Sequence, residues 1–149
     1  MIKLIKETST LSAEETEREG AQLAELLKND SSLPRFIALY GDLGVGKTAF
    51  VRGFASVFSA AAVRSPTFAL VNEYPSSGEK IFHFDMYRIT DEDDLYSIGY
   101  YDYLDRGICL AEWSENIPYA IPENHIRVSI EKSDATLPDA RSIIIGLAE

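Results

Sequence analysis

Gly41-Asp42-Leu43-Gly44-Val45-Gly46-Lys47-Thr48 is the stretch of this sequence that decides its fold. It matches the phosphate-binding loop pattern, in which two glycines separated by four residues precede a lysine and a hydroxyl residue. Glycines in such a loop let the backbone take a positive φ and turn its N–H groups toward phosphate oxygens. The lysine then reaches the β- and γ-phosphates, and the hydroxyl ligates Mg²⁺. The pattern therefore predicts a site for a nucleoside triphosphate.

The sequence on both sides of this loop supplies the strand and the helix that such a loop connects. Residues 36–40 form an unbroken apolar run of strand length, as expected of a central parallel strand. After the loop, apolar residues recur at helical spacing; they are Phe50, Val51, Phe54, Val57 and Phe58. A helix beginning near Lys47 would add unpaired N–H donors and the positive end of its dipole to the phosphate site.

The remaining sequence reads as further strands and helices of one α/β domain. Runs at 68–74 and 81–84 around a Pro-Ser-Ser-Gly turn predict an antiparallel hairpin. Other strands are expected at 2–6, 108–111, 126–130 and 143–147, and helices at 12–29, capped by Ser12, and at 90–97. With no repeat or linker, we predict a single P-loop NTPase domain over residues 1–149. Its fold class would be three-layer α/β/α with a mixed, partly parallel sheet.

The composition favours a soluble, cytoplasmic protein. The 149 residues are 46% hydrophobic, enough for one domain with a proper core. The formal charge of −10 repels a phosphate backbone, so a role around nucleic acid would need a more basic partner. The single cysteine, Cys109, excludes an internal disulfide and suits a reducing compartment. Residues 1–10 lack the apolar core of a secretory signal, and no apolar run approaches the ~20 residues that span a membrane.

Two carboxylates follow apolar strands where a metal ion beside the nucleotide could be held. Residues 81–84 lead into Asp85, and residues 108–111 lead into Glu112. Ligands of α/β sheets sit beyond the carboxyl ends of parallel strands, so both would project toward the loop if their strands run parallel to 36–40. Carboxylates there hold and orient Mg²⁺ and its waters. The sequence leaves open which one touches the metal, and the alternative is that each only ends a strand at the surface.

Three other side chains are candidates with an ordinary structural alternative. Thr67 sits in a Pro-containing loop where nucleotide switches carry a hydroxyl that senses the γ-phosphate, or it forms a strand-entry turn. His83 alternates with phenylalanines, with Asp85 on its own side of the strand, and a lone strand histidine is more often structural. Trp113 could cover the nucleotide or a partner site, or pack simply.

Four motifs in order give the sequence a family resemblance. After the phosphate loop come Ser65-Pro66-Thr67-Phe68, then His83-Phe84-Asp85-Met86-Tyr87-Arg88, then Glu112-Trp113-Ser114-Glu115. Together they resemble the bacterial ATPase subunit of tRNA threonylcarbamoyladenosine biosynthesis, the TsaE (earlier YjeE) family, over residues 41–115. Val45 and Ala49 stand where that family commonly has alanine and threonine, and neither change removes a phosphate or Mg²⁺ ligand.

The resemblance implies a Mg²⁺-dependent ATPase that hydrolyses ATP weakly alone. It would work with the TsaD–TsaB pair, which transfers a threonylcarbamoyl group to the adenosine beside the anticodon of tRNAs reading codons that begin with A. The tRNA would be held only indirectly, through those partners, and hydrolysis would reset or remodel their complex.

The same resemblance implies roles for individual residues. Lys47, Asp85 and Glu112 would be catalytic, with Thr48, Asp85 and Glu112 serving the metal. Thr67 would be switch-like, and Trp113 would lie near the nucleotide. The cofactor-binding residues implied are Gly41, Asp42, Leu43, Gly44, Val45, Gly46, Lys47, Thr48, Ala49, Thr67 and Trp113.

Three other functions share the phosphate loop. A small-molecule kinase usually carries a basic lid, whereas the stretch after Asp85 is acidic. A GTPase would show Asn-Lys-x-Asp and Asp-x-x-Gly sequences, which this chain lacks. A nucleotide-gated interaction subunit, in which ATP shapes a binding surface and hydrolysis is incidental, remains the non-enzymatic alternative. The oligomeric state stays open.

Overall fold

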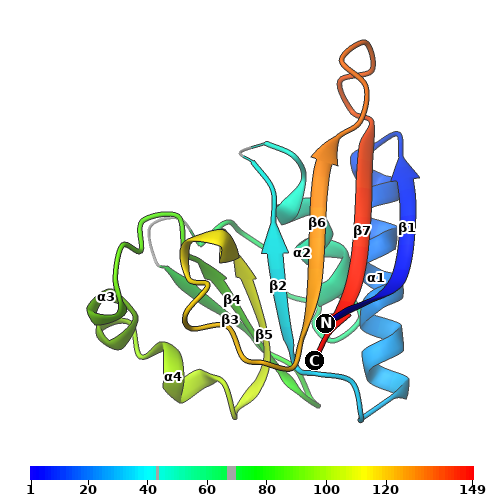
Figure 1. Cartoon of the computed structure of the whole chain (residues 1–149). Coiled ribbons are helices and arrows are strands. Elements are labelled where there is room, and N and C mark those ends of the chain that lie inside the picture. The colour runs from blue at the N-terminus through cyan, green and yellow to red at the C-terminus, as the bar shows by residue number, and fades with distance from the viewer. Residues whose placement is uncertain (43, 67–69) are drawn as a thin grey trace.

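The computed structural model of this chain describes residues 1–42, 44–66 and 70–149, and its centre is one seven-stranded sheet (Figure 1). The strands are β1 (Ile2–Thr10), β2 (Phe36–Tyr40), β3 (Val71–Tyr74), β4 (Lys80–Asp85), β5 (Gly107–Glu112), β6 (His125–Lys132) and β7 (Arg141–Ala148). The helices are α1 (Ala13–Asn29), α2 (Lys47–Ser56), α3 (Glu92–Ser97) and α4 (Tyr100–Tyr103), with a short 3₁₀ turn, η1 (Ser114–Asn116).

The sheet is mixed, and its parallel part lies at its centre. The strand order is β1-β7-β6-β2-β5-β4-β3. β2 runs parallel to both of its neighbours, β5 and β6, and β4 runs parallel to β5. β3, β7 and β1 pair antiparallel with their neighbours. The predicted mixed, partly parallel α/β fold is confirmed, and the carboxyl ends of β2, β4 and β5 meet at one edge.

Side chains of the central strands alternate between two apolar cores, one on each face of the sheet. Ile37 and Leu39 of β2 belong to the core that α1 and α2 cover. Phe36 and Ala38 of the same strand belong to the core that contains Leu95 and Tyr100 of α3 and α4. Both faces of β2 are therefore buried, which explains why its sequence is apolar throughout. The layers are helix, sheet and helix, as predicted.

The helices α1 and α2 pack with their backbones in direct contact. A Cβ placed on Gly20 would lie 2.0 Å from the carbonyl oxygen of Phe50, and one on Gly53 would lie 1.7 Å from that of Glu17. Only glycine fits at these two positions. Because α2 begins at Lys47, this contact fixes the helix that carries the end of the phosphate loop.

Most of the expected elements are present, with shifts at their ends. Ser12 caps α1 by accepting a hydrogen bond from the backbone N–H of Glu15, as predicted. The helix expected at 90–97 begins at Glu92, because Asp91 and not Thr90 is its N-cap. The side chain of Thr90 instead donates to the Asp94 carboxylate.

Three further differences concern β1, β3 and α4. β1 extends beyond its expected end to Thr10, and α4 was not expected. β3 begins at Val71, and residues 68 and 69 of the strand expected at 68–74 lie outside the described residues. Within the described ranges, no helix has the length and apolar character needed to cross a membrane.

Candidate functional site

The phosphate loop lies between the carboxyl end of β2 and the start of α2. Its glycines have the conformations that the pattern predicts, with φ of 148° at Gly41 and 108° at Gly46. At Gly41 a Cβ would also lie 2.5 Å from the carbonyl oxygen of Ile130, so a larger residue cannot be placed there. Gly46 is the N-cap of α2 and has no side chain that could accept a hydrogen bond from the first N–H groups of this helix. The loop therefore has the backbone geometry of an anion cradle.

A cavity of about 280 Å³ opens beside this loop. It collects residues from the loop, from α2, and from the ends of β4 and β5. They are Gly44, Gly46, Lys47, Thr48, Ser65, Asp85, Glu112 and Trp113. A lysine, two hydroxyls and two carboxylates from distant parts of the chain thus surround one space, which we call the phosphate pocket.

The two carboxylates of the phosphate pocket are neighbours because β4 and β5 run parallel. Asp85 and Glu112 face each other in the strand register, at the last residue of each strand. Their exposed fractions are 6% and 5%. One oxygen of Asp85 accepts a hydrogen bond of 2.9 Å from the backbone N–H of Tyr87. Buried, oriented carboxylates at this edge of the sheet can hold a metal ion or a water molecule.

His83 holds the other carboxylate. Its Nε2 bonds Oε2 of Glu112, and its Nδ1 lies 2.8 Å from the hydroxyl oxygen of Tyr74. The side chain of His83 is completely buried. The alternation of the sequence suggested Asp85 as its neighbour, whereas its hydrogen bonds join it to Glu112 and Tyr74 on the two adjacent strands.

Lys47 lines the phosphate pocket, and its ammonium group is held on the backbone of the loop. Its ammonium group donates to the carbonyl oxygen of Gly41 and lies 3.8 Å from the centroid of the Trp113 ring. Burial lowers the pKa of Lys47, and the nearby carboxylates, Glu115 first among them, oppose this shift. Removal from water thus disfavours the charged form of Lys47. A bound phosphate would favour that charged form.

Trp113 connects Lys47 to the surface. It has a positive φ of 59°, and its ring packs 4.9 Å from the ring of Tyr87. Tyr87 is 49% exposed. A side chain that touches the lysine of the loop on one side and an exposed aromatic residue on the other would respond to movement of the lysine.

The other residues expected to bind the cofactor fall into three groups. Thr48 lines the phosphate pocket, and Val45 is buried in the core beneath the loop. Ala49 lines a separate small cavity beside Thr16. Leu43 and Thr67 lie outside the described residues.

Arg141 supports the loop, and the sequence gave no reason to single it out. Its guanidinium donates to the carbonyl oxygen of Val45 at 2.6 Å and to that of Gly44 at 3.2 Å. The same group also donates to the carbonyl oxygens of Pro138 and Ala140, so it ties the loop to the turn before β7. Arg141 is 96 residues from Val45 in the chain. No local sequence signal predicts a contact over that separation.

The donor set of the phosphate pocket fits a magnesium ion held jointly with a nucleotide. Among the described residues there is no group of three or more His, Cys, Asp or Glu residues that could hold a metal alone. Mg²⁺ commonly takes one or two carboxylates, with water and phosphate oxygens as its remaining ligands. Thr48, Asp85 and Glu112 would supply the hydroxyl and carboxylate oxygens of such a site.

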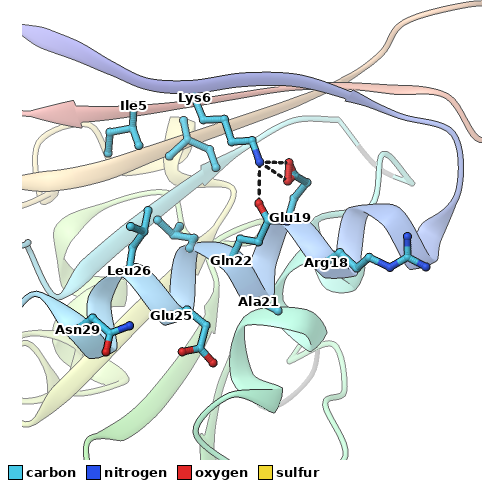
Figure 2. A pocket seen from close by; sticks show the side chains of 11 residues that line it. Ile5, Lys6, Arg18, Glu19, Ala21, Gln22, Glu25, Leu26 and Asn29 are labelled. Carbon is cyan, nitrogen blue, oxygen red and sulfur yellow. Dashed lines mark hydrogen bonds and ion pairs between the residues drawn. The ribbon is translucent and has the colours of Figure 1, made fainter.

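A second hollow of about 600 Å³ lies between α1 and β1, away from the loop (Figure 2). Its lining is mainly apolar and includes Ile5, Leu26 and Ile145. At one end Lys6 bonds Glu19 at 2.8 Å and Gln22 at 2.6 Å, so these three polar side chains are paired with one another (Figure 2). It shares none of the residues that line the phosphate pocket.

Comparison with known proteins gives one consistent result. A family model described as "Threonylcarbamoyl adenosine biosynthesis protein TsaE" matches residues 10–143. The "tRNA threonylcarbamoyladenosine biosynthesis protein TsaE" of Haemophilus influenzae is 42% identical over 129 residues, covering 85% of this chain and 79% of that protein. The protein of the same description from Aquifex aeolicus is 40% identical over 117 residues, covering 76% and 80%. The crystal structure of Bacillus subtilis YdiB aligns with a TM-score of 0.74 and 27% identity, covering 100% of this chain and 88% of the other.

Proposed function

Because the chain belongs to the TsaE family of tRNA threonylcarbamoyladenosine biosynthesis proteins, as its four motifs predicted, we propose that it is a Mg²⁺-dependent ATPase serving this modification. The observation that carries the proposal is the phosphate pocket. Lys47 and Thr48 from the loop face two buried carboxylates, Asp85 and Glu112, across one cavity. This is the set of groups that phosphoryl transfer to water requires.

In this proposal each residue has a defined task. The N–H groups of the loop and the first turn of α2 bind phosphate oxygens, and Lys47 leaves the carbonyl of Gly41 to reach the β- and γ-phosphates. Mg²⁺, when bound, neutralises charge on those phosphates. Asp85 and Glu112 would supply carboxylate oxygens to the metal and orient the attacking water, and His83 would position Glu112 for this task. Thr67 would add a hydroxyl near the γ-phosphate.

We further propose that the chain acts with the TsaD–TsaB pair in the cytoplasm and meets tRNA only through that pair. Its net charge of −10 supports this arrangement, because an acidic surface repels the tRNA backbone. Hydrolysis would then reset the complex between rounds of modification, and the acyl transfer itself would take place on the partners.

The test is phosphate release from ATP by the purified chain, alone and with TsaD–TsaB and substrate tRNA. Lys47→Ala should abolish release and repeated modification, since it removes the positive charge of the loop. Lys28→Ala is the matched control, because it removes the same charge from an exposed position in the last turn of α1. Undiminished repeated turnover by Lys47→Ala would refute the ATPase role.

One observation favours a second candidate, the nucleotide-gated interaction subunit. Lys47 lies 3.8 Å from the centroid of the Trp113 ring, and Trp113 packs on the half-exposed Tyr87, so a shift of Lys47 on phosphate binding would alter a surface without hydrolysis. Glu112→Gln separates the two candidates. If this variant binds ATP and the partners and still supports full repeated modification, hydrolysis is incidental. If modification stops after one round, the ATPase role stands. A phosphorylated small molecule among the products would instead indicate a kinase.

A further inference from the structure

A buried chain of hydrogen bonds leads from Glu112 to the backbone of Arg64. We propose that His83 and Tyr74 form a positioning relay, which orients Glu112 and joins it to the segment that enters the phosphate pocket at Ser65. The inference rests on the proposed ATPase function for its catalytic consequence. The relay itself is a statement about hydrogen bonds that can be tested separately.

The relay crosses three adjacent strands. His83 in β4 bonds Glu112 in β5 through Nε2 and lies 2.8 Å from the hydroxyl of Tyr74 in β3 through Nδ1. The hydroxyl oxygen of Tyr74 accepts from the backbone N–H of Arg64 at 3.3 Å, and the hydroxyl is placed to donate to the carbonyl oxygen of Arg64 at 3.0 Å. Its single hydrogen has two acceptors within reach, this carbonyl and Nδ1 of His83, and the proposed relay gives it to His83. His83 is 0% exposed and Tyr74 4%, so water does not compete for these bonds.

The available hydrogens give the relay a direction. An ionised Glu112 only accepts, so Nε2 of His83 carries the hydrogen between them. In a neutral imidazole Nδ1 is then an acceptor, and the Tyr74 hydroxyl is the group placed to donate to it. The carbonyl oxygen of Arg64 does not depend on that hydroxyl, because Asn72 donates to it at 3.0 Å. Donation thus runs from Arg64 N–H to Tyr74, from Tyr74 to His83, and from His83 to Glu112.

A relay of this kind does two things for the phosphate pocket. It fixes the rotamer of Glu112, in the way that outer hydrogen-bond partners orient ligating and catalytic groups. It also makes the orientation of Glu112 depend on the position of Arg64, whose neighbour Ser65 lines the phosphate pocket. A shift of Arg64 on nucleotide binding would therefore change the hydrogen bonds that hold Glu112. His83 acts through Glu112 and does not touch the reacting atoms, so it is a positioning residue.

A spectroscopic test addresses the relay whether or not the chain hydrolyses ATP. Long-range ¹H–¹⁵N correlation spectra of the imidazole rings distinguish the two neutral tautomers, and the chain has only two histidines, His83 and His125. We expect the Nε2–H tautomer at His83, with a slowly exchanging, downfield Nε2 proton. Tyr74→Phe should keep this tautomer, which Glu112 fixes, should shift the ¹⁵N signal of Nδ1 of His83 because its hydrogen-bond donor is lost, and should leave the signals of His125 unchanged. An Nδ1–H tautomer in the wild-type chain, or an unaffected His83 in Tyr74→Phe, would overturn the relay.

A kinetic test addresses its consequence. His83→Leu should lower kcat for ATP hydrolysis about 10- to 100-fold, the usual effect of removing an outer partner, with KM changed less than about twofold. His83→Gln keeps an N–H that can reach Glu112 and should recover most of the loss. Tyr74→Phe should lower kcat about three- to tenfold. Tyr100→Phe is the matched control, because its buried hydroxyl bonds the carbonyl of Ala120, outside the phosphate pocket, at 2.8 Å.

The outcomes separate the relay from a purely structural role and from failure of the proposed function. If the variants lose thermal stability but keep wild-type kcat, these residues only satisfy buried polar groups, and the positioning role is refuted. If wild-type protein with its partners releases no phosphate, the proposed function fails, and the tautomer spectra still decide the relay. A low kcat in His83→Leu with recovery in His83→Gln supports both.

Discussion

Replacing Gly53 with alanine tests whether the contact between α1 and α2 positions the phosphate loop. Gly53 is buried in α2, and a Cβ there would lie 1.7 Å from the carbonyl oxygen of Glu17 and 2.7 Å from its Cα. Both obstacles belong to the backbone of α1. A change of side-chain rotamer therefore cannot relieve the clash, and one helix must move relative to the other.

The size of the effect follows from two opposing terms. Contacts of a Cβ below 3.0 Å are essentially never seen, so α2 must shift by about 1.3 Å, the difference between this limit and 1.7 Å. Overpacking typically costs about 1–3 kcal/mol and more when the backbone must move, whereas alanine in place of glycine gains about 1 kcal/mol in helix propensity. Because the backbone must move, we take the upper end of this cost and expect a net loss of about 2 kcal/mol. For a chain of this size that lowers Tm by roughly 4–8 °C.

Thermal unfolding followed by far-UV circular dichroism measures the stability, and titration calorimetry measures ATP binding. Because α2 carries Lys47 and Thr48, the displacement should also raise Kd for ATP by about tenfold or more. Gly78→Ala is the control, since a Cβ there meets no heavy atom within 4 Å, and its Tm should change by less than about 2 °C. Helix propensity alone predicts a higher Tm for Gly53→Ala. A higher or unchanged Tm with wild-type ATP affinity would refute the reasoning.

Three further predictions concern Arg141, Trp113 and Cys109. Arg141→Gln should weaken ATP binding about tenfold by calorimetry, because the guanidinium that donates to the Val45 and Gly44 carbonyl oxygens is lost. Arg141→Lys should recover part of the affinity. Wild-type affinity in Arg141→Gln would contradict this. Trp113 is the chain's only tryptophan, so saturating ATP with Mg²⁺ should change its fluorescence as Lys47 withdraws, and constant emission would show that the lysine stays. Burial raises the pKa of Cys109 to about 12, so its thiol should stay protonated and resist Ellman's reagent near pH ~8. The thiol should react once guanidinium unfolds the chain. Rapid labelling of the native protein would disprove its burial.

Much of the fold could be predicted because its signals are local. The apolar run at 36–40 and the loop at 41–48 specify a central strand, a turn and a helix within a few residues of one another. Ser12 and the Pro-Ser-Ser-Gly turn mark boundaries in the same way. The start of α3 was misplaced because Thr90 and Asp91 are both good caps. The cap is Asp91, because its side chain accepts a hydrogen bond from the backbone N–H of Asp94, whereas Thr90 donates to the Asp94 carboxylate.

The connections between site residues were harder to predict because they join distant segments. Asp85 and Glu112 could be proposed as a pair, since each follows an apolar strand. The bond between His83 and Glu112 spans 29 residues and exists only because β4 and β5 pair in one particular register. The contact of Arg141 with the loop depends on where β7 begins in the sheet, between β6 and β1. Sequence patterns identify residue types at strand ends, and the tertiary register decides which of them meet.

Hydrogen bonds from neighbouring residues fix the loop and the two carboxylates of the site, whereas the ammonium group of Lys47 has to change its partner to bind a phosphate. Arg141 holds the loop carbonyls, His83 holds Glu112, and the backbone of Tyr87 holds Asp85. Lys47, by contrast, places its ammonium on the loop carbonyl of Gly41, where burial lowers its pKa. A phosphate would offer this ammonium a full negative charge in place of a carbonyl dipole, so binding favours its movement into the phosphate pocket.

That movement would change the contact of Lys47 with the Trp113 ring, whose centroid lies 4.9 Å from that of the Tyr87 ring. Because Tyr87 is half exposed, a change at Lys47 would reach the surface through these two contacting rings. A partner that contacts Tyr87 would then bind the ATP-loaded and empty forms with different affinity. By linkage, the same partner would change the affinity of the phosphate pocket for ATP by the same factor. The two candidate functions, ATPase and nucleotide-gated subunit, would thus both use the contacts from Lys47 through Trp113 to Tyr87. They differ in whether Glu112 is needed for repeated modification, which Glu112→Gln tests.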